Sequence, residues 1–118
     1  IQEGLDFALE GDTILVEAGT YQENLVINKN ITLTSNYLFN GNINTINETV
    51  IDGNSQTGVL IQNTNESTKI IGFTVCNADD GFLLHSKCQI ISCIIRNCVD
   101  GIDYEKWFMI LLVEKFVY

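Results

Sequence analysis

The pattern of apolar and polar positions repeats in tandem toward the end of the chain. The segment Lys69–Ser86 aligns with Gln89–Lys106 without a gap. A fixed period of about 20 residues predicts a solenoid, in which each coil buries its apolar side against its neighbours. The clearest aligned pairs are Ile70 with Ile90, Ile71 with Ile91, Val75 with Ile95, Asn77 with Asn97, and Asp80-Gly81 with Asp100-Gly101.

Short runs of β-branched and apolar residues, bounded by Gly, Asn or Asp, precede the repeat and indicate further strands. These runs are Ile14–Val16, Gly19–Tyr21, Asn24–Ile27, Ile31–Thr34, Thr49–Ile51 and Val59–Ile61. No two-residue hairpin signal joins one run to the next, so we expect parallel pairing between coils about 4.8 Å apart. The residues expected to face inward in the repeat are Ile70, Phe73, Val75, Ala78, Phe82 and Leu84, then Ile90, Cys93, Ile95, Cys98, Ile102 and Tyr104.

One domain is expected over residues 1–106. Residues 1–10 carry apolar side chains at helical spacing and predict a short helix that ends before Gly11 and covers the first coil. Residues 36–48 contain five asparagines and predict an exposed, mobile loop. The apolar tail 107–118 lacks the register of the tandem units, and we expect either a cap or a truncated or frame-shifted end of a longer protein.

Charge and hydropathy limit the partners of the chain. It has 118 residues and a formal net charge of −9, and Arg96 is its one arginine, so nucleic acid is not an expected partner. The longest apolar run, Trp107–Val113, is shorter than the roughly 18 residues that a membrane span needs. The chain begins at Ile1 with no signal sequence, so we expect a mature form or a fragment, located outside the cell or at its surface.

The four cysteines lie close together in the sequence, at Cys76, Cys88, Cys93 and Cys98. Their spacing matches neither a CxxC pair nor a small disulfide scaffold. Cys93 and Cys98 align with Phe73 and Ala78, both expected to face inward. We therefore predict buried free thiols that act as small apolar side chains, in preference to a thiolate metal site.

Four motifs in the first third of the chain carry a family resemblance. They are Gly11-Asp12-Thr13, Gly19-Thr20-Tyr21, Glu23-Asn24 and Asn30-Ile31-Thr32-Leu33. Together with the expected cap helix they resemble the N-terminal portion of right-handed parallel β-helix proteins of the pectin-lyase-like superfamily. The resemblance implies an all-β, right-handed parallel β-helix with about 20 residues per coil and a short N-terminal capping helix. This superfamily includes lyases, galacturonases, epimerases, tailspikes and adhesins, so the resemblance specifies fold more than function.

A leucine-rich repeat is the alternative solenoid. The spacing of Ile90, Cys93, Ile95 and Cys98 fits its signature. The next apolar position of that signature falls on Asp100, however, and no helical stretch closes either unit. The parallel β-helix is therefore favoured.

The Asp-Gly corners hold the best candidates for a functional surface. After each corner the odd positions should face solvent, which selects His85 on one coil and Asp103 and Glu105 on the next. The register of the tandem units stacks Asp80 under Asp100 and His85 under Glu105, and Asp79 precedes the first corner. Stacked carboxylates repel unless a cation, water or backbone donor intervenes. Either the aspartates cap their own turns, or Asp80 and Asp100, with Asp79 and Asp103, help to hold Ca²⁺.

Two functions are compatible with these residues. The first is a non-catalytic β-helix scaffold, exported, that presents a surface for a polysaccharide or a surface protein. The alternative is the N-terminal fragment of a polysaccharide lyase or hydrolase acting on uronate-containing glycans. No catalytic residue can be assigned, because Asn77–Gly81 resembles a galacturonase motif only slightly and the accompanying Gly-His-Gly and Arg-x-Lys motifs are missing. We also expect end-to-end association at the last coil, near Tyr104, unless the tail covers it.

Three Asn-x-Ser/Thr triplets begin at Asn30, Asn47 and Asn65. They match the acceptor pattern for N-glycosylation. A chain with 13 asparagines also produces such triplets by chance.

Overall fold

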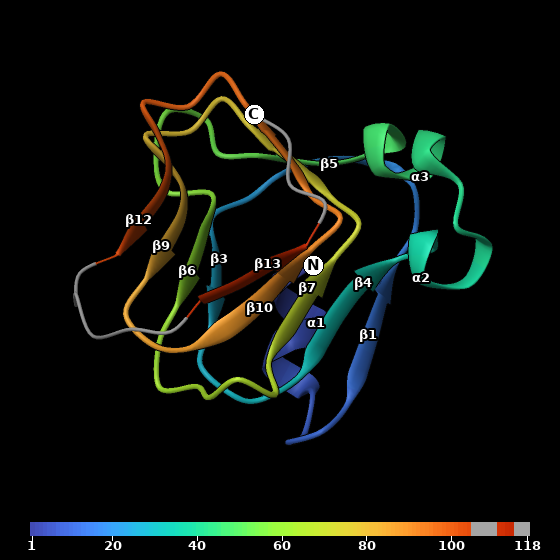
Figure 1. Cartoon of the computed structure of the whole chain (residues 1–118), viewed down its shortest axis with the longest axis vertical. Coiled ribbons are helices and arrows are strands. Elements are labelled where there is room, and N and C mark those ends of the chain that lie inside the picture. The colour runs from blue at the N-terminus through green and yellow to red at the C-terminus, as the bar shows by residue number, and fades with distance from the viewer. Residues whose placement is uncertain (105–110, 115–118) are drawn as a thin grey trace.

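Strands outnumber helices in the computed structural model, which describes residues 1–104 and 111–114 (Figure 1). The helices are α1 (Gln2–Phe7), α2 (Tyr37–Asn40) and α3 (Ile43–Glu48). The strands are β1 (Thr13–Val16), β2 (Gly19–Gln22), β3 (Leu25–Ile27), β4 (Thr32–Ser35), β5 (Thr49–Asp52), β6 (Val59–Ile61), β7 (Lys69–Ile71), β8 (Thr74–Cys76), β9 (Asp80–Leu84), β10 (Cys88–Ile91), β11 (Ile94–Arg96), β12 (Asp100–Tyr104) and β13 (Leu111–Glu114). The predicted all-β class is confirmed.

Every third strand of the chain joins the same sheet. One sheet has the order β1-β4-β7-β10-β13, the second β11-β8-β5-β2 and the third β12-β9-β6-β3. All the strand pairs formed by the described residues are parallel. Each circuit of the chain therefore adds one strand to each sheet, which makes the protein a parallel β-solenoid. Figure 1 shows β3, β6, β9 and β12 side by side in this way.

The tandem units form two successive circuits in the predicted register. The paired residues are Lys69 with Gln89, Ile70 with Ile90, Val75 with Ile95 and Asp80 with Asp100. Within residues 69–104 the structure contains strands and turns but no helix. A leucine-rich repeat is therefore excluded, because its units close with a helix or a 3₁₀ turn.

The core lies between the three sheets and contains most of the residues expected to face inward, but the prediction is wrong for Tyr104. All six of those in the first tandem unit are buried, and Phe73 and Phe82 have no exposed surface. In the second unit Ile90, Cys93 and Ile95 are buried, whereas Cys98 and Ile102 are half-buried and Tyr104 is 51% exposed. The second unit stacks on the first, and among the described strands only β13 follows it, so its outer side has fewer neighbours.

The N-terminal helix is shorter than the predicted 1–10. It ends at Phe7, and Ala8 already has an extended backbone. The N–H of Leu9 donates to the carboxylate of Asp12 at 2.8 Å, and the Lys29 ammonium donates to the carbonyl of Ala8 at 2.8 Å. These contacts hold the chain in a turn, so Leu9 is exposed rather than part of a buried helix face.

Helix α1 also protects the free edge of strand β3. The side-chain amide of Gln2 donates to the Val26 carbonyl at 3.1 Å and accepts from the Val26 N–H at 2.8 Å. A paired strand would make the same two hydrogen bonds to Val26. Unpaired strand edges promote aggregation. The Gln2 side chain therefore takes the place of a strand at this end of the sheet.

The expected loop 36–48 is instead folded into α2 and α3. Gly41 ends α2 with a left-handed backbone, and the Asn42 side chain caps α3 by accepting from the Asn44 N–H at 3.0 Å. Ile46 is buried, and its carbonyl accepts from the Thr74 hydroxyl of β8 at 2.8 Å. The segment therefore forms two short helices, one of them capped by an asparagine, and Ile46 attaches it to the solenoid.

The tail contributes one strand within its described part. Strand β13 pairs with β10, and Cys88 aligns with Leu111. This offset is longer than the one between the tandem units. None of the helices in residues 1–104 has the length and apolarity that crossing a membrane requires.

Candidate functional site

The corner between the second and third sheets is built on a chain of amide and carboxylate groups. Asn77 and Asn97 adopt left-handed backbones there, with φ of 53° and 54°, a conformation that Asn tolerates well. The Asn97 amide donates to Oδ1 of Asn77, and the Asn77 amide donates to Oδ2 of Asp52 at 3.0 Å. Three successive circuits are thus joined side chain to side chain at one corner.

Two hydrogen bonds at this corner favour the ionised form of the Asp52 carboxyl group. The Asn77 amide is the main cause, and the N–H of Asn54, which donates to Oδ1 at 2.9 Å, is the second. Both donors stabilise the charged form, so the pKa of Asp52 lies below its usual value. The corner therefore presents a carboxylate and two amides in a row.

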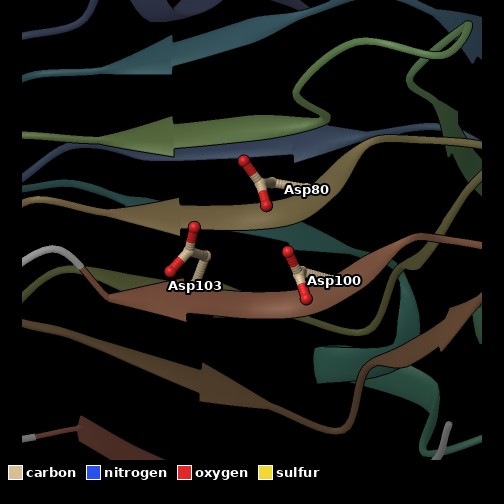
Figure 2. A group of neighbouring side chains, drawn as sticks. All are labelled: Asp80, Asp100 and Asp103. Carbon is tan, nitrogen blue, oxygen red and sulfur yellow. The ribbon is translucent and has the colours of Figure 1, made fainter.

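An acidic group defined by Asp80, Asp100 and Asp103 lies just beyond this corner, and we call it the aspartate trio. One carboxylate oxygen from each residue lies within 4.8 Å of the other two. Figure 2 shows the three side chains together, Asp80 on β9 and Asp100 and Asp103 on β12. Asp80 and Asp103 are half-buried, and Asp100 is exposed.

An open hollow of about 570 Å³ lies at the same corner. Its lining is mainly polar and comes from three circuits of the chain. The lining residues are Ser55, Asn77, Ala78, Asp79, Asn97, Cys98 and Val99. Val99 is 79% exposed and gives the rim an apolar contact surface.

The structure brings some of the predicted site residues together and separates others. Asp80 and Asp100 pair in register as expected, and Asp103 joins them. Asp79 is exposed and lines the hollow instead. His85 follows the last residue of β9 and is half-buried. Glu105 lies outside the described residues, so its predicted stacking over His85 stays a prediction.

No sequence pattern predicts the hollow. The hydrogen-bonded asparagines beside it are indicated only by the alignment of the two tandem units. Asn77 and Asn97 occupy the same place in the two tandem units. That coincidence is the signal from which their hydrogen bond could have been predicted. The contribution of Asp52 was not visible, because the circuit before Asn77 has a different length.

The cysteines behave as small apolar side chains. All four are free, and Cys76, Cys88 and Cys93 are buried while Cys98 is half-buried. Burial raises the pKa of Cys88 to about 12 and that of Cys93 to about 11. Thiols of this kind stay protonated and are poor nucleophiles and metal ligands. The predicted free, buried state is confirmed for the first three.

Carboxylates spaced like the aspartate trio have two chemical uses. Several carboxylate oxygens are the ligand set that Ca²⁺ prefers. A pair of neighbouring carboxylates also serves as acid and base, or acid and nucleophile, in glycoside hydrolysis. The turn-capping role is observed at two other aspartates, since Asp12 and Asp52 accept from backbone N–H groups. For Asp80 and Asp100 the predicted alternatives remain a turn role and a cation role.

Comparisons with family models, with curated proteins and with solved structures found no match to this chain.

Proposed function

We propose that this chain is a right-handed parallel β-helix with about 20 residues per coil, related to the pectin-lyase-like superfamily. In this proposal it is an exported, non-catalytic scaffold that binds a polysaccharide or a surface protein along the corner between its second and third sheets. The left-handed asparagine corners, the short strands and the α1 cap support the fold assignment. The stacked polar groups of the corner support the binding role.

One observation carries the binding role: equivalent polar groups recur on successive circuits at one corner. The Asp52–Asn77–Asn97 chain and the Asp80–Asp100 pair both run along the solenoid axis. Successive circuits are about 4.8 Å apart. An extended ligand lying along the axis would meet a hydrogen-bonding group at each step, and the hollow beside the trio gives it room.

The charge of the chain restricts how it could hold an acidic glycan. The net charge is −9, and the trio concentrates three carboxylates at the proposed surface. A uronate polymer would be repelled unless a divalent cation bridged the two. We therefore expect polygalacturonate and alginate to bind in Ca²⁺ and to dissociate in a chelator, whereas a neutral glycan would bind in both.

The test is retention of the folded protein on immobilised polygalacturonate, alginate and a neutral glucan, with Ca²⁺ or with a chelator. The triple variant Asp80→Asn/Asp100→Asn/Asp103→Asn should lose at least tenfold in affinity for the uronate polymers. A matched control is Glu3→Gln/Glu48→Gln/Glu66→Gln, which makes the same change in net charge at exposed positions away from the corner. Equal binding by the two variants, or no binding by the unmodified chain, would refute the role of the corner.

The second candidate, a fragment of a polysaccharide lyase or hydrolase, is favoured by the closeness of the trio. Lyases of the superfamily use a calcium-held uronate, and hydrolases use a pair of carboxylates. The same polymers, incubated with the protein, would then yield unsaturated products or new reducing ends. The scaffold proposal expects neither product at any Ca²⁺ concentration. Calorimetric titration with Ca²⁺ alone would show whether the trio holds the cation in either case.

A further inference from the structure

The three Asn-x-Ser/Thr triplets have different conformations in the folded chain. A glycan acceptor needs its Asn amide accessible and its hydroxyl residue reachable by the same transferase. The structure satisfies both requirements at Asn65 and fails at least one of them at Asn30 and Asn47. The sequence pattern alone does not distinguish the three triplets as acceptors.

Asn65 lies on the surface, in the connection between β6 and β7. Asn65 and Ser67 are both exposed. Oδ1 of Asn65 accepts from the Ser67 hydroxyl at 2.6 Å and from the Ser67 N–H at 2.9 Å. Among the residues that the structure describes, the Nδ2 group of Asn65 makes no hydrogen bond. The hydroxyl and the amide of one triplet thus face each other at the surface, with the amide nitrogen left for reaction.

The backbone of this connection is held in place while its side chains are exposed. The N–H of Asn65 donates to Oδ1 of Asn30 at 2.8 Å, and the carbonyl of Glu66 accepts from the Gln89 amide at 2.6 Å. The N–H of Thr68 donates to the Asn65 carbonyl at 3.1 Å. The conformation that presents Asn65 is therefore part of the fold, and a glycan there would not disturb these bonds.

Asn30 is less accessible than Asn65, and its side chain joins two circuits of the solenoid. Its Oδ1 accepts from the N–H of Asn65 and, at 2.9 Å, from the hydroxyl of Thr68. Both Asn30 and the hydroxyl residue of its triplet, Thr32, are half-buried, and the Thr32 N–H is bonded to the Asp12 carbonyl at 2.9 Å. A transferase would have to pull β4 out of its sheet to reach them.

Asn47 is exposed, but its hydroxyl partner is not. Thr49 has no exposed surface, and its hydroxyl donates to the Thr45 carbonyl at 2.8 Å. The Asn47 amide donates to the Ile43 carbonyl at 3.5 Å within α3. A transferase that must contact both Asn47 and Thr49 cannot reach the Thr49 hydroxyl while this helical turn is folded.

We propose that Asn65 is a site of N-linked glycosylation in the folded chain. The sugar donor is a lipid-linked diphosphate oligosaccharide, used by an oligosaccharyltransferase. Nδ2 of Asn65 attacks the anomeric carbon, the new C–N bond replaces the C–O bond to the diphosphate, and the lipid diphosphate leaves with that electron pair. Nδ2 loses one proton to a base of the transferase. The hydrogen bond from Ser67 to Oδ1 makes the Nδ2 protons more acidic and so assists this loss.

The inference shares with the proposed function only the expectation of export, and its test requires neither export nor ligand binding. Purified folded protein is incubated with transferase-containing membranes and the lipid-linked donor. Occupancy at each triplet is then measured by mass spectrometry after enzymatic release of the glycan in heavy-oxygen water. Occupancy at Asn65 should exceed that at Asn30 and Asn47 by at least tenfold. Ser67→Ala should abolish it, Ser67→Thr should retain it, and Thr49→Ala should leave it unchanged.

Synthetic peptides spanning residues 28–34, 45–51 and 63–69 provide the unfolded controls. All three should be accepted by the same membranes, which would show that the fold selects Asn65. The proposal is overturned by an unmodified Asn65 in the folded protein when the 63–69 peptide is glycosylated. Equal occupancy of Asn65 and either of the other two triplets in the folded protein would also overturn it.

Discussion

Adjacent isoleucines on opposite faces of one strand give a sensitive test of the core. Ile95 is 1% exposed and aligns in its sheet with Val75, which is fully buried. Ile94 is half-buried on the other face of β11. Ile→Ala removes three carbon atoms, each worth about 0.8 kcal/mol when buried. At Ile95 the transfer term alone is therefore about 2.4 kcal/mol, and the cavity left behind raises the expected loss to about 3–4 kcal/mol.

The same substitution at Ile94 should cost below about 1 kcal/mol, because the side chain is already partly in solvent and no closed cavity results. Urea unfolding followed by circular dichroism measures both variants. With a slope of about 1–3 kcal/mol/M, the midpoint of Ile95→Ala should fall by about 1–4 M, and that of Ile94→Ala by no more than about a third as much. Equal losses in the two variants would show that β11 does not face the core as described.

Three further predictions concern the corner and the thiols. Asn77→Ala should destabilise by about 1–2 kcal/mol more than Asn77→Gly in the same unfolding assay, because only the alanine strains the left-handed backbone; equal effects would contradict the observed φ. Asp52 has a lowered pKa, so the stability it contributes is present above its unfolded pKa and is lost as the pH falls through its folded pKa. The acid limb of a stability–pH curve should therefore be shallower in Asp52→Asn, and an unchanged limb would refute this. A thiol reagent at pH 8 should modify Cys98 first, and Cys88 and Cys93 only as fast as the protein opens; prompt reaction of Cys88 and Cys93 would contradict their burial.

The stacking of the tandem units could be predicted because burial imposes a strict pattern on parallel strands. Each circuit places its apolar residues over those of its neighbour, so the period alone aligned Ile70 with Ile90 and Asp80 with Asp100. The exposure of Tyr104 was not predicted. It depends on how many circuits follow, which the repeat itself does not specify.

The ends of helices and the content of the insertion could not be predicted, since they depend on contacts between distant residues. Helix α1 ends early because Asp12 and Lys29 hold the chain beyond it. The asparagine-rich segment is typical of a loop by composition, yet Ile46 anchors it to β8. Neither partner can be identified before the circuits are assembled.

The candidate site was predicted in part. The stacking of Asp80 and Asp100 followed from the register, and Asp103 was already a candidate. Its approach to the other two depends on the path of the strand beyond the Asp-Gly corner, which alternation does not fix. Asp79 was placed with them by its position in the sequence, but it lies in the corner between the second and third sheets and lines the hollow.

The parallel stacking of the tandem units is the central claim, and backbone proton contacts measured by nuclear magnetic resonance test it most directly. The structure predicts interstrand contacts at one constant offset in residue number, running in the same direction along each strand: Ile70 with Ile90, Val75 with Ile95 and Phe82 with Ile102. Parallel strands give this constant offset, whereas antiparallel strands give pairs whose residue numbers have a constant sum. Contacts that follow the antiparallel pattern, or a constant offset different from that of these three pairs, would contradict the fold on which the candidate site depends.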